Sequence, residues 1–110
     1  MTIRAALLDL HRALVEAERR EHEKTLGRLS GGEFLQALIT DPVFAWLRPL
    51  TTLIVRLEEL GDAPDADLLA AARALFSQES EFRLRSAALV QRSPDVAFAY
   101  AAARRTALGG

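Results

Sequence analysis

Two histidines and a few carboxylates are the side chains of this 110-residue sequence best suited to metal or ligand chemistry. When the first predicted helix is drawn as a wheel, His11, Glu18 and His22 fall close together inside its apolar arc. Glu18 and His22 are four residues apart, so both could reach one ion from the same face of the helix. Imidazole nitrogens and carboxylate oxygens that converge inside a helical bundle bind iron, manganese or zinc. These three residues are therefore candidate ligands.

A fourth candidate ligand, Glu79, lies between Leu75 and Phe82 in the inward seam that we expect for a helix over residues 65–92. If that helix packs antiparallel to the first, the Glu79 carboxylate faces the histidines. Di-iron bundles, however, carry a Glu-x-x-His pattern, whereas here an arginine stands three residues before His22. In the alternative interpretation, the charged second half of the first helix lies in solvent, or arginines pair with these carboxylates. The sequence leaves open both a bound transition metal and the absence of any cofactor.

Four breaks divide the chain into the elements that would position these side chains. They are clusters of glycine, proline, serine and aspartate at residues 30–33, 40–42, 61–67 and 93–95. Between the breaks, apolar residues recur at helical spacing, and no stretch alternates with the period of a strand. We predict an all-α fold with one domain over residues 1–110. Its bundle would contain one short helix, 32–39, and four main helices, 2–28, 42–60, 65–92 and 94 onward. A bend at 77–80 is the alternative to a continuous helix over 65–92.

The segment DPVFAWLRPLTTLIVRLEEL, residues 41–60, is the most apolar part of the chain. Asp41 followed by Pro42 is typical of a helix N-terminus. Pro49 predicts a kink, because a proline inside a helix removes one N–H donor and clashes with the preceding turn. Most apolar residues of the segment share one broad arc, which predicts a central core helix, and its charged residues exclude a membrane span. Phe44 and Val55 lie near the polar stripe instead, and the kink could turn Phe44 inward.

Aromatic residues suggest that an interaction surface is the main functional feature. Phe44 and Trp46 could anchor a partner rather than fill the core, because aromatic side chains are enriched among residues that dominate binding energy. Val55 would be exposed, and in the alanine-rich last helix Phe98 lies on the outer face, opposite Tyr100. We therefore expect a non-enzymatic interaction or regulatory module that binds a protein partner or forms a homodimer. Its candidate contacts are Phe44, Trp46, Val55 and Phe98. The alternative is a metal- or small-ligand-binding bundle that uses His11, Glu18, His22 and Glu79.

Composition and charge exclude several other classes. The net charge of −1 provides no basic footprint for nucleic acid, and the absence of cysteine excludes disulfides and thiolate chemistry. No grouping of serine, histidine, aspartate or lysine has the context of a catalytic site, so no catalytic residue is assigned. Charged residues near the N-terminus interrupt the apolar core that a signal peptide needs, and no stretch of about 20 apolar residues could span a membrane. We expect a cytoplasmic protein that binds neither nucleic acid nor membrane.

The stretch DPVFAWLRPLTTLIV resembles a segment of small, uncharacterised, all-helical bacterial proteins. The resemblance covers about Leu14 to Glu59. It implies a helical fold and a bacterial origin, and it carries over no activity, cofactor or partner.

Overall fold

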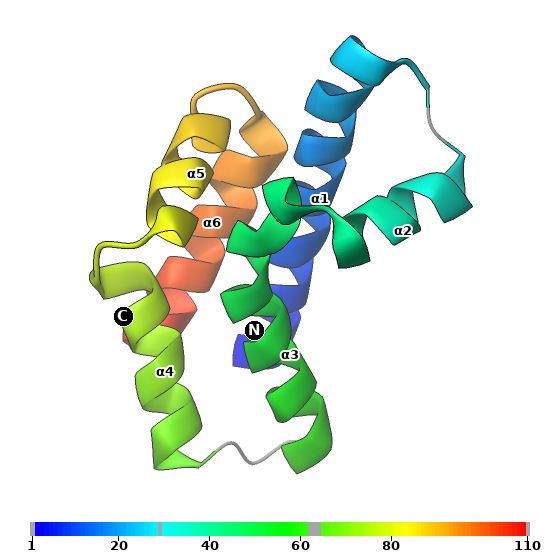
Figure 1. Ribbon diagram of the computed structural model, residues 1–110. Helices are drawn as coiled ribbons and strands as arrows, with labels where there is room; N and C mark the ends of the chain where they lie inside the picture. The colour runs from blue at the N-terminus through cyan, green and yellow to red at the C-terminus, as the bar shows by residue number, and fades with distance from the viewer. Residues whose placement is uncertain (1, 29, 62–64, 110) are drawn as a thin grey trace.

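The computed structural model describes residues 2–28, 30–61 and 65–109, and within these ranges the regular structure is entirely helical (Figure 1). The predicted all-α class is therefore confirmed, with more helices than the sequence suggested. The elements are α1 (Ile3–Leu26), α2 (Gly31–Thr40), the 3-10 helix η1 (Pro42–Leu47), α3 (Arg48–Leu60), α4 (Ala66–Ser77), α5 (Glu81–Val90) and α6 (Pro94–Leu108).

Short polar side chains define where the helices begin. Thr2 Oγ1 accepts a hydrogen bond from the Ala5 amide at 3.1 Å, which satisfies one of the free N–H groups of the first turn of α1. Ser30 and Glu33 form a reciprocal capping box at α2. The predicted cap at Asp41 is confirmed, since its Oδ1 accepts from an amide of η1 at 3.0 Å. The corresponding caps of the last three helices are Asp65, Ser80 and Ser93.

Two glycines mark where α1 and α3 end. Gly27 has φ 79° and Gly61 has φ 72°, conformations that other residues adopt with strain. The amide of Gly27 donates to the carbonyl of Glu23 at 2.8 Å and closes the last turn of α1. The predicted break at 61–67 begins at Gly61, as expected, but its residues 62–64 lie outside the described ranges.

The prediction of one continuous helix over residues 65–92 is wrong. The structure instead has two helices, α4 and α5, which are separated at the serine-rich stretch where the bend was the alternative. The Ser80 hydroxyl accepts from the Arg83 amide at 3.2 Å and so begins a new helix. The Arg83 guanidinium then reaches back, and its Nη1 donates to the Ser77 carbonyl at 3.2 Å. Serine side chains that bond local backbone groups compete with helix continuation, which explains the break.

The segment 42–60 also differs from the single kinked helix that was predicted. Residues 42–47 wind as the 3-10 helix η1, and the α-helix begins at Arg48, so Pro49 stands in the first turn of α3. A proline is tolerated there because its missing N–H would have no partner within the helix. A 3-10 helix turns through more degrees per residue than an α-helix, so one wheel cannot describe the whole segment. The side chain of Phe44 consequently faces inward and is only 2% exposed.

The helices α1 and α6 form the centre of the bundle and run in opposite directions (Figure 1). Arg92, just before α6, lies 3.5 Å from the carboxylate of Glu21 near the end of α1, in agreement with this orientation. The helix α3 packs against both α1 and α4, while α5 packs against α6. Among the described helices, α3, α4 and α5 pack against the α1–α6 pair, and Phe98 of α6 stays 82% exposed.

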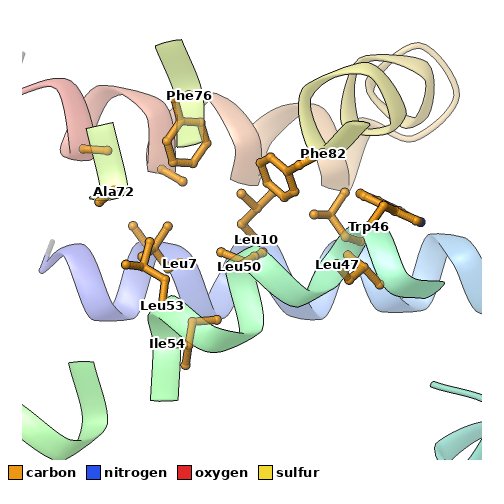
Figure 2. Close-up of a cluster of buried hydrophobic side chains, with 14 of the residues drawn as sticks. Leu7, Leu10, Trp46, Leu47, Leu50, Leu53, Ile54, Ala72, Phe76 and Phe82 are labelled. Carbon is orange, nitrogen blue, oxygen red and sulfur yellow. The ribbon is translucent and has the colours of Figure 1, made fainter. Parts of the chain in front are cut away.

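The core lies where α1, α3 and the α4–α5 corner meet (Figure 2). Leu7 and Leu10 of α1 face Leu50 of α3, and Phe76 and Phe82 close the cluster from the other side. The two phenylalanine rings meet edge to face, with centroids 6.2 Å apart and planes at 84°. The inward face predicted for the first helix is confirmed by the burial of Leu7, Leu10, Leu14 and Ala17.

The helix α2 is the least covered helix of the described chain (Figure 1). Only Phe34 of this helix is buried, and its ring lies edge-on to that of Phe44, with centroids 5.7 Å apart. Leu35 and Ile39 are 58% and 62% exposed. The axis of α2 is bent by 75° from that of the segment 42–60 that follows it. No single helix of the described ranges is long and apolar enough to cross a membrane.

Candidate functional site

The structure assigns His11 to a bond between helices. Its Nε2 lies 3.1 Å from Thr51 Oγ1, and that hydroxyl lies 3.2 Å from the Leu47 carbonyl oxygen. The single hydroxyl proton of Thr51 can be donated only once, so when it goes to Leu47 the His11 Nε2 must carry the proton that Thr51 accepts. Burial lowers the pKa of His11, which favours the neutral ring. This bond joins α1 to the first turns of α3.

Glu18 and His22 remain neighbours on α1, as predicted. Burial raises the pKa of the half-buried Glu18 carboxyl, and the nearby charges of Arg85 and His22 oppose that rise. The ring of His22 packs against Phe44, with centroids 5.4 Å apart and planes at 57°. Both side chains therefore have structural surroundings that account for their position inside the apolar arc.

The prediction that Glu79 lies in an inward seam is wrong. The break between α4 and α5 places Glu79 in the connection between them, where its side chain is exposed. Across the described ranges, no three or more histidine, aspartate and glutamate side chains form a group that could hold a metal ion. The four predicted ligands His11, Glu18, His22 and Glu79 are thus not brought together as a metal site.

Phe44 and Trp46, two of the four predicted partner contacts, are core residues. Phe44 is 2% exposed and Trp46 is 3% exposed, and the Trp46 ring lies 6.1 Å from that of Phe82. Neither is available on the surface of this fold, so their assignment as partner anchors is corrected. Val55 is half exposed on α3, and Phe98 is 82% exposed on α6. The prediction that Phe98 points outward is therefore confirmed.

Phe98 borders a groove of about 490 Å³ between α1 and α6. Small side chains line the groove from both helices, and they are Ala6, Ala13, Ala99 and Ala102. Its rim carries the acidic residues Asp9, Glu16 and Asp95, together with Arg12, whose Nη1 is 4.0 Å from Asp9. We name one face of α6 the α6 surface. It consists of Asp95, Phe98, Ala102 and the exposed Arg105. A large exposed ring beside a groove of small residues is a feature of helix–helix contacts.

The groove could not be predicted from the sequence, although Phe98 could. Helical spacing places Phe98 opposite the inward residues of α6, which shows that it is exposed. Only the tertiary arrangement shows that the alanines of α1 lie beside it. A second exposed apolar group, here named the α2 surface, consists of Leu35 and Ile39, which lie one turn apart on α2. It was hidden from sequence reasoning because those residues have the spacing of a buried face.

A further cavity of about 510 Å³ lies between α3, α4 and the start of α5. Trp46, Leu53, Leu75 and Phe82 contribute apolar walls, and Arg56 is among the polar residues that line it. The Trp46 Nε1 is fully buried and donates to no acceptor among the described residues. A buried donor without a partner is uncommon in folded proteins. Because a water-sized probe does not reach the Nε1, this donor faces the packed interior and not the open cavity.

No protein-family model, no curated protein and no solved structure matches this chain. Function must therefore be inferred from the side chains and their geometry.

Proposed function

We propose that this chain is a non-enzymatic protein–protein interaction module that associates with itself through the α6 surface. The observation that carries the proposal is the 82% exposure of Phe98 beside the groove between α1 and α6. The other four phenylalanines of the sequence are buried. A single exposed Phe among buried ones, next to a groove that could receive a ring, favours a contact surface over a tolerated surface residue.

The free energy available from burying Phe98 suggests that self-association is weak. Complete burial of an exposed Phe side chain contributes about 2 kcal/mol, so a symmetric contact with two such rings contributes about 4 kcal/mol. Other contacts add to this sum, while lost rotational and translational freedom subtracts from it. We therefore expect a dissociation constant of roughly 10 µM to 1 mM, the range of small transient interfaces.

The remaining polar side chains support a binding role over a catalytic one. His11 is engaged by Thr51, and Glu21 contacts both Lys24 at 3.0 Å and Arg92 at 3.5 Å. The pKa of Glu21 is lowered mainly by its hydrogen bond from Lys24. Such contacts are those of structural ion pairs and cross-helix bonds.

Two glutamate substitutions test the proposal. We expect the weight-average mass of the wild-type chain to rise above the 12.1 kDa of one chain as its concentration increases, measured by light scattering after gel filtration. Phe98→Glu would place a charge at the contact and hold the mass at that of a monomer. Ile39→Glu is the matched control, because it adds the same charge to the exposed α2 surface. Association that is lost in Ile39→Glu and kept in Phe98→Glu would contradict the proposal, as would a wild-type monomer at all concentrations.

A further inference from the structure

The four residues of the α6 surface have the same spacing whether the helix is followed from its N-terminus or from its C-terminus. Asp95, Phe98, Ala102 and Arg105 follow one another at intervals of three, four and three residues, which keeps them on one face of a helix. The centre of this pattern is residue 100. Asp95 and Arg105 stand five residues to either side of it, and Phe98 and Ala102 stand two residues to either side.

Such a pattern is self-complementary when two identical helices pair in opposite directions. Antiparallel pairing about residue 100 places Asp95 of one copy opposite Arg105 of the other. It also places the large Phe98 ring opposite the small Ala102 side chain, so the two surfaces match in size as well as in charge. A two-fold axis generates each contact twice, as in isologous dimers.

The charges distinguish this orientation from the parallel one. Asp95 and Arg105 are both exposed, and neither makes an ion pair with another described residue. Parallel pairing would place Asp95 next to Asp95 and Arg105 next to Arg105, which is unfavourable at both ends. Antiparallel pairing also opposes the two helix dipoles. Glu16, on the groove rim beside Asp95, adds a second carboxylate near the incoming arginine.

We propose that two copies of this chain pair antiparallel through α6, with Phe98 of each over Ala102 of the other and Asp95 opposite Arg105. This inference rests on the proposed self-association and adds its partner and geometry. The α2 surface carries no comparable arrangement, because Leu35 and Ile39 are both apolar and specify neither an orientation nor a partner. A 15-residue helix is about 22 Å long, so the contact is small and its charged ends are open to solvent. Added salt therefore weakens it.

Charge reversal tests the geometry. Asp95→Arg places two arginines together at each end of the dimer, and Arg105→Asp places two aspartates together. We expect each single variant to weaken the dimer at least about fivefold, since two attractive pairs become repulsive. The double variant Asp95→Arg/Arg105→Asp restores opposite charges at both ends, and we expect its dissociation constant to return within about threefold of the wild-type value.

The double variant also controls for effects within one chain. Asp95 lies in the first turn of α6 and Arg105 in the last, so each reversal opposes the dipole of its own helix. The double variant carries both of these intrachain penalties. Recovered association could therefore not come from a more stable helix. Circular dichroism of all three variants establishes that they are folded under the conditions of sedimentation equilibrium.

Each outcome separates the inference from the function on which it rests. Loss in both single variants with recovery in the double variant supports antiparallel pairing. If Phe98→Glu abolishes association while the charge reversals have no effect, or the double variant does not recover, the chain self-associates but the antiparallel geometry is overturned. A wild-type chain that is monomeric at every concentration overturns both.

Discussion

The buried hydroxyl of Ser86 leads to a prediction whose sign is unusual for a core substitution. Ser86 is 0% exposed, and its Oγ makes no hydrogen bond with any described residue. A buried hydroxyl without a partner costs about 1–3 kcal/mol. Ser86→Ala removes that cost and gains about 0.5 kcal/mol in helix propensity, while the small space left by one oxygen atom costs about 0.5 kcal/mol. We therefore expect the variant to be more stable by about 1–3 kcal/mol.

Ser80→Ala is the matched control, because the same chemical change occurs nearby with the opposite expected sign. Ser80 Oγ accepts from the Arg83 amide at 3.2 Å and caps α5. Loss of such a cap costs about 1 kcal/mol. The change in the free energy of unfolding of each variant can be measured by urea unfolding, followed by circular dichroism and by the fluorescence of the buried Trp46. A gain of 1 kcal/mol corresponds to a rise of about 4–8 °C in the melting temperature of a domain of this size.

Two results would contradict the predicted effect of Ser86→Ala. If Ser86→Ala is destabilised by as much as Ser80→Ala, the Ser86 hydroxyl is satisfied in the folded chain, and the packing around α5 differs from that described. If both variants are unchanged, the unpaired hydroxyl does not carry the expected penalty.

Three further predictions concern the core, the pH dependence and the dimer. Phe82→Ala should lower the free energy of unfolding by about 3–5 kcal/mol in urea, because Phe82 is buried where three helices meet; a loss below about 1 kcal/mol would contradict that packing. Burial lowers the pKa of His11 below its ordinary 6.5, so between the folded and unfolded values the unfolded chain binds more protons. The stability that the neutral His11 ring contributes is therefore present above pH 6.5 and is lost as the pH falls through the pKa of the folded chain. Urea unfolding of a His11→Gln chain at several pH values should lack this part of the pH dependence. Identical pH profiles for the wild-type and His11→Gln chains would refute the prediction. In a chain without native cysteine, Ala101→Cys should be linked into dimers by a short bis-maleimide cross-linker, because antiparallel pairing offsets the two copies of residue 101 by only about 3 Å along the axis. Leu108→Cys should not, because the same pairing offsets its copies by about 24 Å; more efficient cross-linking at 108 would indicate parallel helices.

The sequence was sufficient to predict the helical class and most of the helix starts. Asp41 was identified at a helix N-terminus because short acceptor side chains satisfy free amides wherever a helix begins. The inward face of α1 followed from the recurrence of Leu7, Leu10 and Leu14. These features depend on local chemistry, which a single sequence displays directly.

What the sequence could not predict depends on competition between local and tertiary interactions. Ser80 begins a new helix partly because the Arg83 side chain bonds the carbonyl of Ser77, a contact that no periodicity reveals. The resulting break moved Glu79 out of the seam, and with it the predicted metal site. The 3-10 winding before Arg48 shifted the phase of the segment and buried Phe44. The groove beside Phe98 required knowledge of which helix packs next to α6.

Fluorine NMR of a chain labelled with 4-fluorophenylalanine can detect self-association at the Phe98 ring itself. The chain has five phenylalanines, of which four are buried and only Phe98 is exposed. The resonance of Phe98 is identified by its absence in Phe98→Leu. If two copies associate through the α6 surface, this resonance alone should move as the concentration rises from about 10 µM to about 1 mM, the range expected for a small interface. A Phe98 resonance that stays constant across this range would contradict the claim.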